Sequence, residues 1–293
     1  MIDIDKLVRP NVRSLTPYSC ARDEFTGKAD VFLDANENPY GYLNRYPDPY
    51  QRELKAEISR IKNVPEDKIF LGNGSDEIID LCFRILCRPG IDKALTFSPT
   101  YGMYQVSASV NDIEIIKVPL DKNFQIDLNN TKELLNDENL KLIFICSPNN
   151  PTGNCMNRSV VKEIISEFKG IVLVDEAYID FADEASMIQE LNSYDNLIVM
   201  QTFSKAFGLA AARVGIAYTN PAIVSYLNKM KPPYNISTIN QKAVLQKLKK
   251  LSTYKGQLRK IKKERARLAA ELNKLPVCLL YTSDAADEED SVD

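Results

Sequence analysis

Seven short apolar runs alternate with amphipathic stretches along most of the chain, and this alternation limits the fold more than any other feature. Several of the runs are apolar at nearly every position, which is typical of strands covered on both faces of a sheet. The seven runs span residues 69–71, 94–97, 113–118, 142–146, 171–174, 197–200 and 215–218. The stretches that we expect to be helical span residues 53–61, 76–87, 101–109, 159–169 and 221–229. The pattern predicts an α/β domain with a mainly parallel sheet.

The segments outside this alternation differ from it in composition. Residues 1–30 are mixed and polar, and we expect them to form an N-terminal arm with little regular structure. Residues 31–50 are rich in proline and tyrosine and begin the large domain, which we expect to end at residue 240. Residues 241–275 carry apolar side chains at spacings of three, four and seven, which predicts one long helix. Because six of the last ten residues are acidic, we expect residues 276–293 to be an atypical, disordered tail.

The chain has no histidine, and this absence removes several kinds of active site. A Ser-His-Asp triad, a Cys-His pair and an imidazole metal ligand are excluded, and we expect no metal site. Acid–base chemistry is left to Lys, Tyr, Asp, Glu or Cys. The six cysteines form no C-x-x-C pair, so we expect reduced, mostly buried thiols in a cytoplasmic protein.

Charge and hydropathy argue against two classes of partner. The chain has 37 basic and 40 acidic residues, whereas nucleic-acid binders usually carry a net basic face. The expected helix at 241–275 does have a basic side, and we favour a solvated helix face over a nucleic-acid patch there. No apolar run approaches the roughly 18 residues that a membrane span needs. We therefore expect neither nucleic acid nor a membrane as a partner.

Polar segments follow several of the expected strands. In the sequence GNGSDE (72–77) two glycines lead into a helix, which predicts either an anion site at the helix start or an ordinary N-cap by Ser75. The sequence SPNNPTG (147–153) places two asparagines where α/β sheets bind ligands, although a tight loop also explains it. Asp175 comes directly after four apolar residues and favours a cationic partner, either Mg²⁺ or a protonated heterocyclic nitrogen.

A lysine among apolar neighbours completes the set. Lys205 follows an apolar strand and lies among Phe and Ala residues, where desolvation would lower its pKa and make its amine nucleophilic. A surface lysine is the alternative interpretation. A phosphate cradle, an amide, a carboxylate, this lysine and Arg213 at the strand ends of one sheet fit one cofactor, pyridoxal 5'-phosphate.

These motifs resemble a known family over residues 8–275. SPNNPTG, VDEAY (174–178) and TFSKAFGLAAARVG (202–215) are similar to segments of the aspartate-aminotransferase superfamily. More narrowly, the chain resembles histidinol-phosphate aminotransferases in VRSLTPY (12–18), LDANENPYG (33–41), NRYPDP (44–49), GNGSDE and SPTYGMY (98–104). The resemblance implies a three-layer α/β sandwich. It also implies transamination between histidinol phosphate and 2-oxoglutarate, giving imidazole-acetol phosphate and glutamate, in histidine biosynthesis.

The resemblance also implies roles for individual residues at the ring. Lys205 would form a Schiff base with the cofactor and then move a proton between the substrate's α-carbon and the cofactor. Asp175 would pair with the pyridinium nitrogen. Asn150 and Tyr178 would hydrogen-bond the phenolate oxygen, and Tyr101 would stack on the ring.

The remaining implied roles concern the phosphate and the substrate. Ser75, Asp76, Ser204 and Arg213 would hold the phosphate. Tyr46 would reach the phosphate of a neighbouring subunit, which implies a homodimer. Tyr18 and Asn36 would lie near the substrate.

The resemblance ends near residue 275. Members of the family continue beyond the matching position into a small domain that carries the substrate-binding arginines. We therefore expect a chain cut short, with an incomplete small domain at 241–275 and an exposed apolar stripe on its helix. A related aminotransferase for aromatic amino acids, a phospho-amino-acid decarboxylase and an inactive fragment that binds only the cofactor or a partner remain open. A nucleotide-binding module is disfavoured, because neither glycine fingerprint is present.

Overall fold

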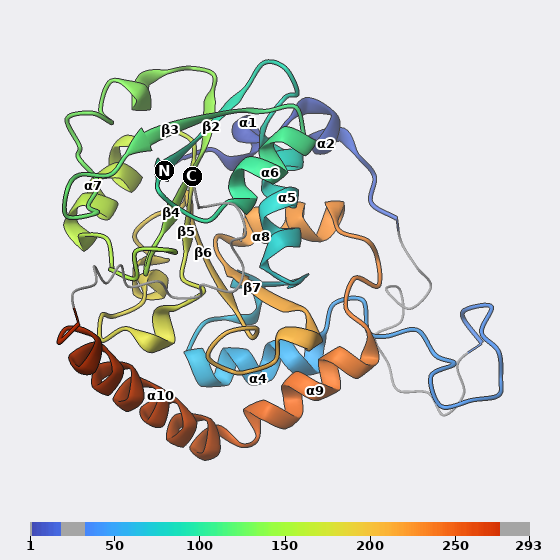
Figure 1. Ribbon diagram of the computed structural model, residues 1–293. Coiled ribbons are helices and arrows are strands. Elements are labelled where there is room, and N and C mark those ends of the chain that lie inside the picture. The colour runs from blue at the N-terminus through green and yellow to red at the C-terminus, as the bar shows by residue number, and fades with distance from the viewer. Residues whose placement is uncertain (1, 19–32, 276–293) are drawn as a thin grey trace.

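A seven-stranded sheet forms the centre of the molecule in the computed structural model, which describes residues 2–18 and 33–275 (Figure 1). Its strands are β1 (Ile69–Asn73), β2 (Lys93–Ser98), β3 (Glu114–Pro119), β4 (Leu140–Cys146), β5 (Ile171–Asp175), β6 (Leu197–Thr202) and β7 (Val214–Tyr218). They lie in the order β1-β7-β6-β5-β4-β2-β3, and only β7 is antiparallel to its neighbours. The seven predicted strands and the mainly parallel sheet are confirmed.

Helices cover both faces of the sheet. The helices are α1 (Ile4–Leu7), α2 (Pro10–Ser14), α4 (Arg52–Lys62), α5 (Ser75–Leu86), α6 (Met103–Val110), α7 (Arg158–Glu167), α8 (Pro221–Met230), α9 (Thr238–Leu248) and α10 (Leu251–Leu272). Short 3-10 turns are η1 (Glu66–Lys68), η2 (Leu134–Asn136), η3 (Ile179–Phe181), η4 (Met187–Glu190) and η5 (Ala210–Ala212). Two apolar cores result, one under α4, α7 and α9 and one under α5, α6 and α8.

The alternation of side chains along β5 explains its continuous apolar run. Val172 and Val174 belong to one core, whereas Ile171 and Leu173 belong to the other. Successive residues of a strand point to opposite faces, so a strand covered on both sides has no solvent-facing position to make polar. Polar residues are therefore confined to the ends of such strands.

The prediction of little regular structure for residues 1–30 is wrong for the first part of that segment. Helices α1 and α2 form there, and Ile4, Val8 and Val12 are buried in the core under α5 and α8. The N–H of Arg9 also donates to the carbonyl of Ile85 at 2.9 Å. These helices are short, so their stability comes from tertiary packing that local propensity does not reveal.

The prediction of one helix over 241–275 is also wrong. The chain forms α9 and α10, and Lys250 between them leaves the helical conformation with φ −116° and ψ 40°. Helix α9 buries Val244 and Leu248 in the sheet core. The ring of Tyr254 in α10 stacks on Phe207 with 4.0 Å between centroids. The bend allows both contacts.

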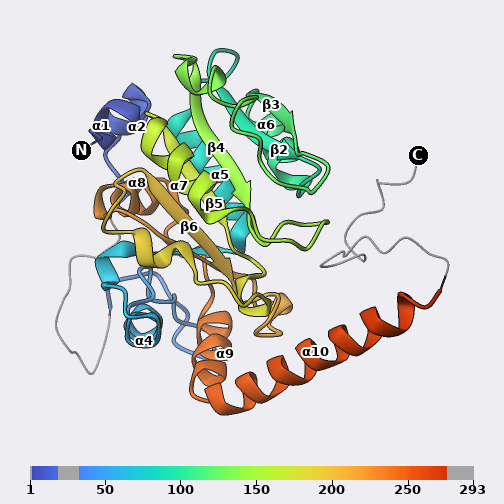
Figure 2. The same ribbon diagram turned by 90° about the vertical axis from the view of Figure 1, so that its left-hand side faces the viewer.

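Beyond Tyr254, α10 leads away from the body of the molecule (Figure 2). Ile261 and Leu268 on this helix are about half exposed, as expected for an apolar stripe with no domain packed on it. Lys262 ties the middle of α10 to Asp183. Within the described part of the chain no helix is both long and apolar enough to cross a membrane. The predicted tail at 276–293 lies outside the described residues, and the division into domains stays a prediction.

The predicted burial of the thiols holds for three of the cysteines. Cys82, Cys87 and Cys146 are buried free thiols, and burial raises the pKa of each. Cys155 is only half-buried. Cys20 and Cys278 lie outside the described residues.

The contrast along α10 gives a stability prediction. Tyr254→Ala removes a buried ring from a stack and should lower the free energy of unfolding by about 3 kcal/mol. Leu268→Ala, on the half-exposed part of the same helix, should change it by less than about 0.5 kcal/mol. Urea denaturation of both variants measures the difference, and equal losses would contradict this description of the helix.

Candidate active site

The polar residues singled out in the sequence meet at one edge of the sheet. Asp175 ends β5, Thr202 ends β6 and Asn73 ends β1, and these three strands run in the same direction. Strand β7 runs the opposite way, so its start lies at this same edge, with Val214 paired to Asn73. Lys205, Asp175, Arg213 and the β1–α5 turn therefore emerge together at the edge where α/β sheets bind ligands.

Asp175 carries a buried carboxyl group. Its side chain is only 3% exposed, and it accepts hydrogen bonds from the Tyr104 hydroxyl at 2.7 Å and from the Ala177 N–H at 3.0 Å. Burial raises its pKa from 3.8 to about 6, although the two hydrogen bonds and the nearby charge of Lys205 act in the opposite direction. A carboxyl group in this state would gain from a cationic partner, since a charge pair offsets desolvation.

Tyr104 is a residue that the sequence interpretation missed. It is fully buried, and its ring stacks on Phe144 with 4.7 Å between centroids. Tyr101 meets it edge-on at 5.6 Å. No local signal in the sequence points to Tyr104, because it lies at the start of α6 and its partner Asp175 is 71 residues away.

Lys205 lies in the turn that follows β6 and is half-buried. Its Nζ is 5.3 Å from the centroid of the Tyr178 ring, and Tyr178 is itself buried. The three residues expected to be catalytic, Lys205, Asp175 and Tyr178, are therefore brought together by the fold. The expected low pKa of the lysine stays a prediction.

The turn between β1 and α5 is shaped for an anion. Gly74, with φ +80°, precedes the helix, and no side chain caps the first turn in the manner of an N-cap. The alternative of a capping Ser75 is therefore wrong, since Ser75 is the first helical residue. The opening N–H groups of a helix have no partner inside it, and its dipole favours negative charge there.

Two glycines allow other segments to approach this turn closely. A Cβ at Gly215 would lie 2.5 Å from the Ser75 nitrogen, and one at Gly74 would lie 2.6 Å from a guanidinium nitrogen of Arg213. Arg213 pairs with the Asp76 carboxylate at 3.0 Å, and the Tyr101 hydroxyl donates to the same carboxylate at 3.3 Å. A helix start beside an arginine, with space that any side chain would fill, fits a phosphate group. Ser204 is half-buried next to Lys205.

The two asparagines of SPNNPTG have different environments. Asn149 is fully engaged: its amide donates to Pro99 and Thr152 and accepts from Thr100. Asn150 is 2% exposed, and its side-chain oxygen meets no donor among the residues that the structure describes. A buried polar atom without a partner costs about 1–3 kcal/mol. A polar ring substituent could satisfy the Asn150 amide, so this residue fits the expected cofactor.

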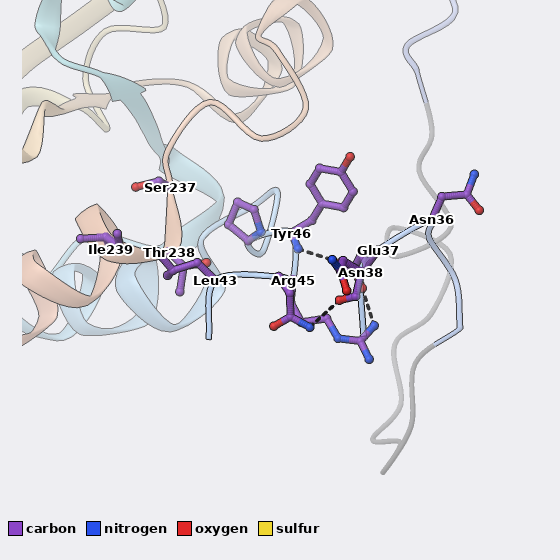
Figure 3. A pocket seen from close by; sticks show the side chains of 11 residues that line it. Asn36, Glu37, Asn38, Leu43, Arg45, Tyr46, Ser237, Thr238 and Ile239 are labelled. Carbon is purple, nitrogen blue, oxygen red and sulfur yellow. Dashed lines mark hydrogen bonds and ion pairs between the residues drawn. The ribbon is translucent and has the colours of Figure 1, made fainter. Parts of the chain in front are cut away.

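The other expected site residues do not join this group within one chain. Tyr46 is half-exposed and stacks on Tyr234 at 4.5 Å between centroids. Asn36 and Tyr46 help to line a pocket of about 370 Å³ between residues 36–47 and the start of α9 (Figure 3). Neither Lys205 nor Asp175 lines it. Tyr18 is 74% exposed.

Comparisons with known proteins identify the family of the chain. Residues 28–286 match the family model for aminotransferase class I and II. The chain is 53% identical to a histidinol-phosphate aminotransferase of Cytophaga hutchinsonii, over 96% of this chain and 82% of that protein. It is 50% identical to a histidinol-phosphate aminotransferase of Parabacteroides distasonis, over 97% of this chain and 83% of that protein.

Solved structures show the same architecture. The crystal structure of histidinol-phosphate aminotransferase from Sinorhizobium meliloti in complex with pyridoxal-5'-phosphate matches with a TM-score of 0.73 at 25% identity. That match covers 78% of this chain and 63% of the solved one. Aspartate aminotransferase from Thermotoga maritima matches in fold, with a TM-score of 0.73 at 24% identity over 81% of this chain and 67% of that one.

Burial of Asp175 predicts a particular pH dependence of stability. Because its pKa is raised, the unfolded chain loses this proton first as the pH rises from about 4 to about 6, and the native state loses stability over that window. A pKa raised by about two corresponds to about 3 kcal/mol, and Asn would lose about 1 kcal/mol of hydrogen bonding. Asp175→Asn should therefore stabilise the cofactor-free protein by about 1–2 kcal/mol at pH 8, and by less at pH 4.5.

Asp92 supplies the matched control, measured by urea denaturation at the two pH values. Burial alone would raise the pKa of Asp92, but its hydrogen bonds from Arg88 outweigh this and hold the pKa below 3.8. Asp92→Asn should therefore destabilise the protein at pH 8, with the opposite sign to Asp175→Asn. The same sign for both variants would refute the electrostatic description of Asp175.

Proposed function

The chain belongs to the class I and II aminotransferase family, and from this premise we propose that it transfers an amino group between histidinol phosphate and 2-oxoglutarate, with pyridoxal 5'-phosphate as cofactor. The relatives at 50–53% identity carry the name of this activity. The observation that carries the proposal is the meeting of Lys205, the buried Asp175 and the Ser75 turn at one edge of the sheet. No residue of this arrangement is a histidine, and the reaction requires none.

The residues divide the work between an amine and a carboxyl group. When bound, the cofactor supplies an aldehyde that condenses with amines and a ring that accepts electrons from the substrate's α-carbon. Lys205 would hold the aldehyde carbon and, once displaced by the substrate's amine, would move a proton from the α-carbon with its Nζ. The half-buried position of Lys205 keeps that amine partly shielded from water.

Asp175 would hold a proton on the ring nitrogen. A charge pair in contact is worth about 4 kcal/mol at an effective dielectric constant near 20, which raises the nitrogen's pKa by about 3. The Tyr104 hydroxyl and the Ala177 N–H keep the carboxyl group oriented and favour its ionised form. Tyr104 is in this sense a positioning residue, since it acts through Asp175.

The remaining residues at the sheet edge would bind and orient the cofactor. Asn150 and Tyr178 would contact the ring oxygen, and Tyr101 would cover a ring face. Ser75 and Asp76 would offer their N–H groups to the phosphate. Arg213 would contribute a guanidinium that is at present paired with the Asp76 carboxylate. Ser204 would add a hydroxyl group.

We propose that a second copy of the chain completes the site. Leu33, Tyr40 and Tyr42 are 83–92% exposed, on a segment that projects from the body of the molecule (Figure 1). Large apolar side chains gathered on a projecting segment are typical of an interface. In a homodimer, Tyr46 on this segment would reach the phosphate in the partner's site. Tyr18 and Asn36 would lie near the substrate.

Visible absorbance tests the assignment of the lysine. The full chain should develop the absorbance that pyridoxal 5'-phosphate acquires on binding a lysine, and glutamate should remove it while 2-oxoglutarate is released. Lys205→Ala should show neither change, whereas Lys122→Ala, on an exposed loop, should behave as the wild type. Borohydride reduction and peptide mapping identify the labelled lysine, and a label elsewhere would overturn the proposal.

Turnover tests the role of the carboxyl group. A loss of about 4 kcal/mol of charge pairing predicts that Asp175→Asn lowers kcat by on the order of 10³-fold while still binding cofactor. Tyr104→Phe removes one hydrogen bond to a charged group and should lower kcat by about tenfold. Steady-state turnover with saturating histidinol phosphate and 2-oxoglutarate gives both values. Near-wild-type turnover in Asp175→Asn would remove the electron-sink argument.

A further inference from the structure

Asn235, in the loop between α8 and α9, joins three separate parts of the molecule. It is buried, and its amide nitrogen donates to the carbonyl of Leu71 in β1 at 3.0 Å and to Glu77 Oε2 in α5 at 2.8 Å. Its amide oxygen accepts from Gln51 Nε2, just before α4, at 3.2 Å. Both the amide nitrogen and the amide oxygen of Asn235 thus form hydrogen bonds with residues that lie far apart in the sequence.

Glu77 connects Asn235 to the phosphate turn. Its Oε2 also accepts from the backbone N–H of Asn73 at 2.5 Å, so the carboxylate closes the turn that contains Gly74. A glutamate in the first turn of a helix that reaches back to the preceding N–H fixes how the chain enters that helix. Glu77 therefore sets the shape in which the N–H groups of Ser75 and Asp76 are presented, and Asn235 holds Glu77 in place.

Gln51 connects Asn235 to the base of a second segment, residues 33–51. We call this segment the arm, as distinct from the N-terminal residues 1–30. Gln51 is 1% exposed and has φ 49° and ψ 43°, a left-handed conformation that residues other than glycine seldom adopt. Its Nε2 donates to the carbonyl of Pro49 at 2.8 Å as well as to Asn235. The strained residue is thus held by the same amide that holds Glu77.

Further contacts attach the base of the arm to the α8–α9 loop and to the first turn of α9. Lys231 Nζ donates to the Pro49 carbonyl at 2.8 Å, and Gln241 Nε2 donates to the Asp48 carbonyl at 3.2 Å. Tyr234, next to Asn235, stacks on Tyr46 with an angle of 14° between the rings. The arm and the phosphate turn are therefore attached to one short segment of chain.

We propose that Asn235 is a positioning residue, which shapes the phosphate turn through Glu77 and fixes the base of the arm through Gln51. This inference rests on the proposed function, because it concerns the cofactor's phosphate at Ser75 and Asp76. Removing the hydrogen bonds of Asn235 should therefore alter two regions at once. These are the phosphate turn of a chain and the arm that this chain offers to a second copy.

Two cofactor forms separate a role at the phosphate from a general structural role. Pyridoxal 5'-phosphate and pyridoxal share the ring and the aldehyde, but only the first has a phosphate. In the cofactor-free full chain, Asn235→Ala should weaken binding of pyridoxal 5'-phosphate by about tenfold and change the affinity for pyridoxal by less than about twofold. Titration of the visible absorbance gives both dissociation constants.

Asn196 offers a matched control at the opposite edge of the sheet. Asn196 lies just before β6 and is also buried, and its amide donates to the backbone carbonyls of Ile165, Phe168 and Gly170, which lie in α7 and before β5. Asn196→Ala should lower the melting temperature and leave the ratio of the two dissociation constants unchanged. If Asn235→Ala also leaves this ratio unchanged, or weakens both ligands equally, the proposal is wrong.

The glutamate and the glutamine provide independent tests. Glu77→Ala should change the ratio as Asn235→Ala does, whereas Glu77→Gln keeps an oxygen for both donors and should hold the ratio within about threefold of the wild type. Gln51→Ala should lower the preference for the phosphate form by about threefold. An unchanged preference would show that the arm does not affect the shape of the phosphate turn. A wild-type chain with no preference for the phosphate form would instead contradict the proposed function.

Discussion

Helices on both faces of the central sheet leave an inner strand such as β5 no polar position except at its end, and the site depends on this constraint. Along β5, successive residues enter two different cores, so the first place where a polar side chain can appear is Asp175. The same argument applies to the ends of β1 and β6. Polar side chains therefore lie together at a single edge of the sheet, and the direction of each strand decides which residues meet there.

The reversed strand β7 adds a cation to that edge. Arg213 precedes β7 and would lie at the far end of the sheet if this strand ran parallel to its neighbours. Because β7 runs the other way between β1 and β6, the guanidinium comes beside the start of α5. The site thus combines an arginine, a helix start and a buried carboxyl group from elements that are well separated in the sequence. None of these groups is a histidine.

Local patterns predicted the parts of this structure that local forces determine. The seven strands follow from continuous apolar runs, and Asp175 and Lys205 follow from their positions just after such runs. The bend at Lys250 did not follow, because the helical period is unbroken there and the contacts that the bend allows, such as the stack of Tyr254 on Phe207, are tertiary. Tyr104 and Asn235 act on partners 71 and 184 residues away, a separation at which no spacing rule applies.

Gly215 shows how a site can constrain a residue that binds nothing. It lies within β7 and pairs with Gly72 and Thr202, where β-branched side chains usually suit a strand best. The approach of the Ser75 nitrogen to the space over its Cα leaves no room even for a methyl group. A valine at this position would suit the strand better but would push the helix start outward. Strand propensity and anion binding therefore favour different residues here, and the glycine preserves the helix start.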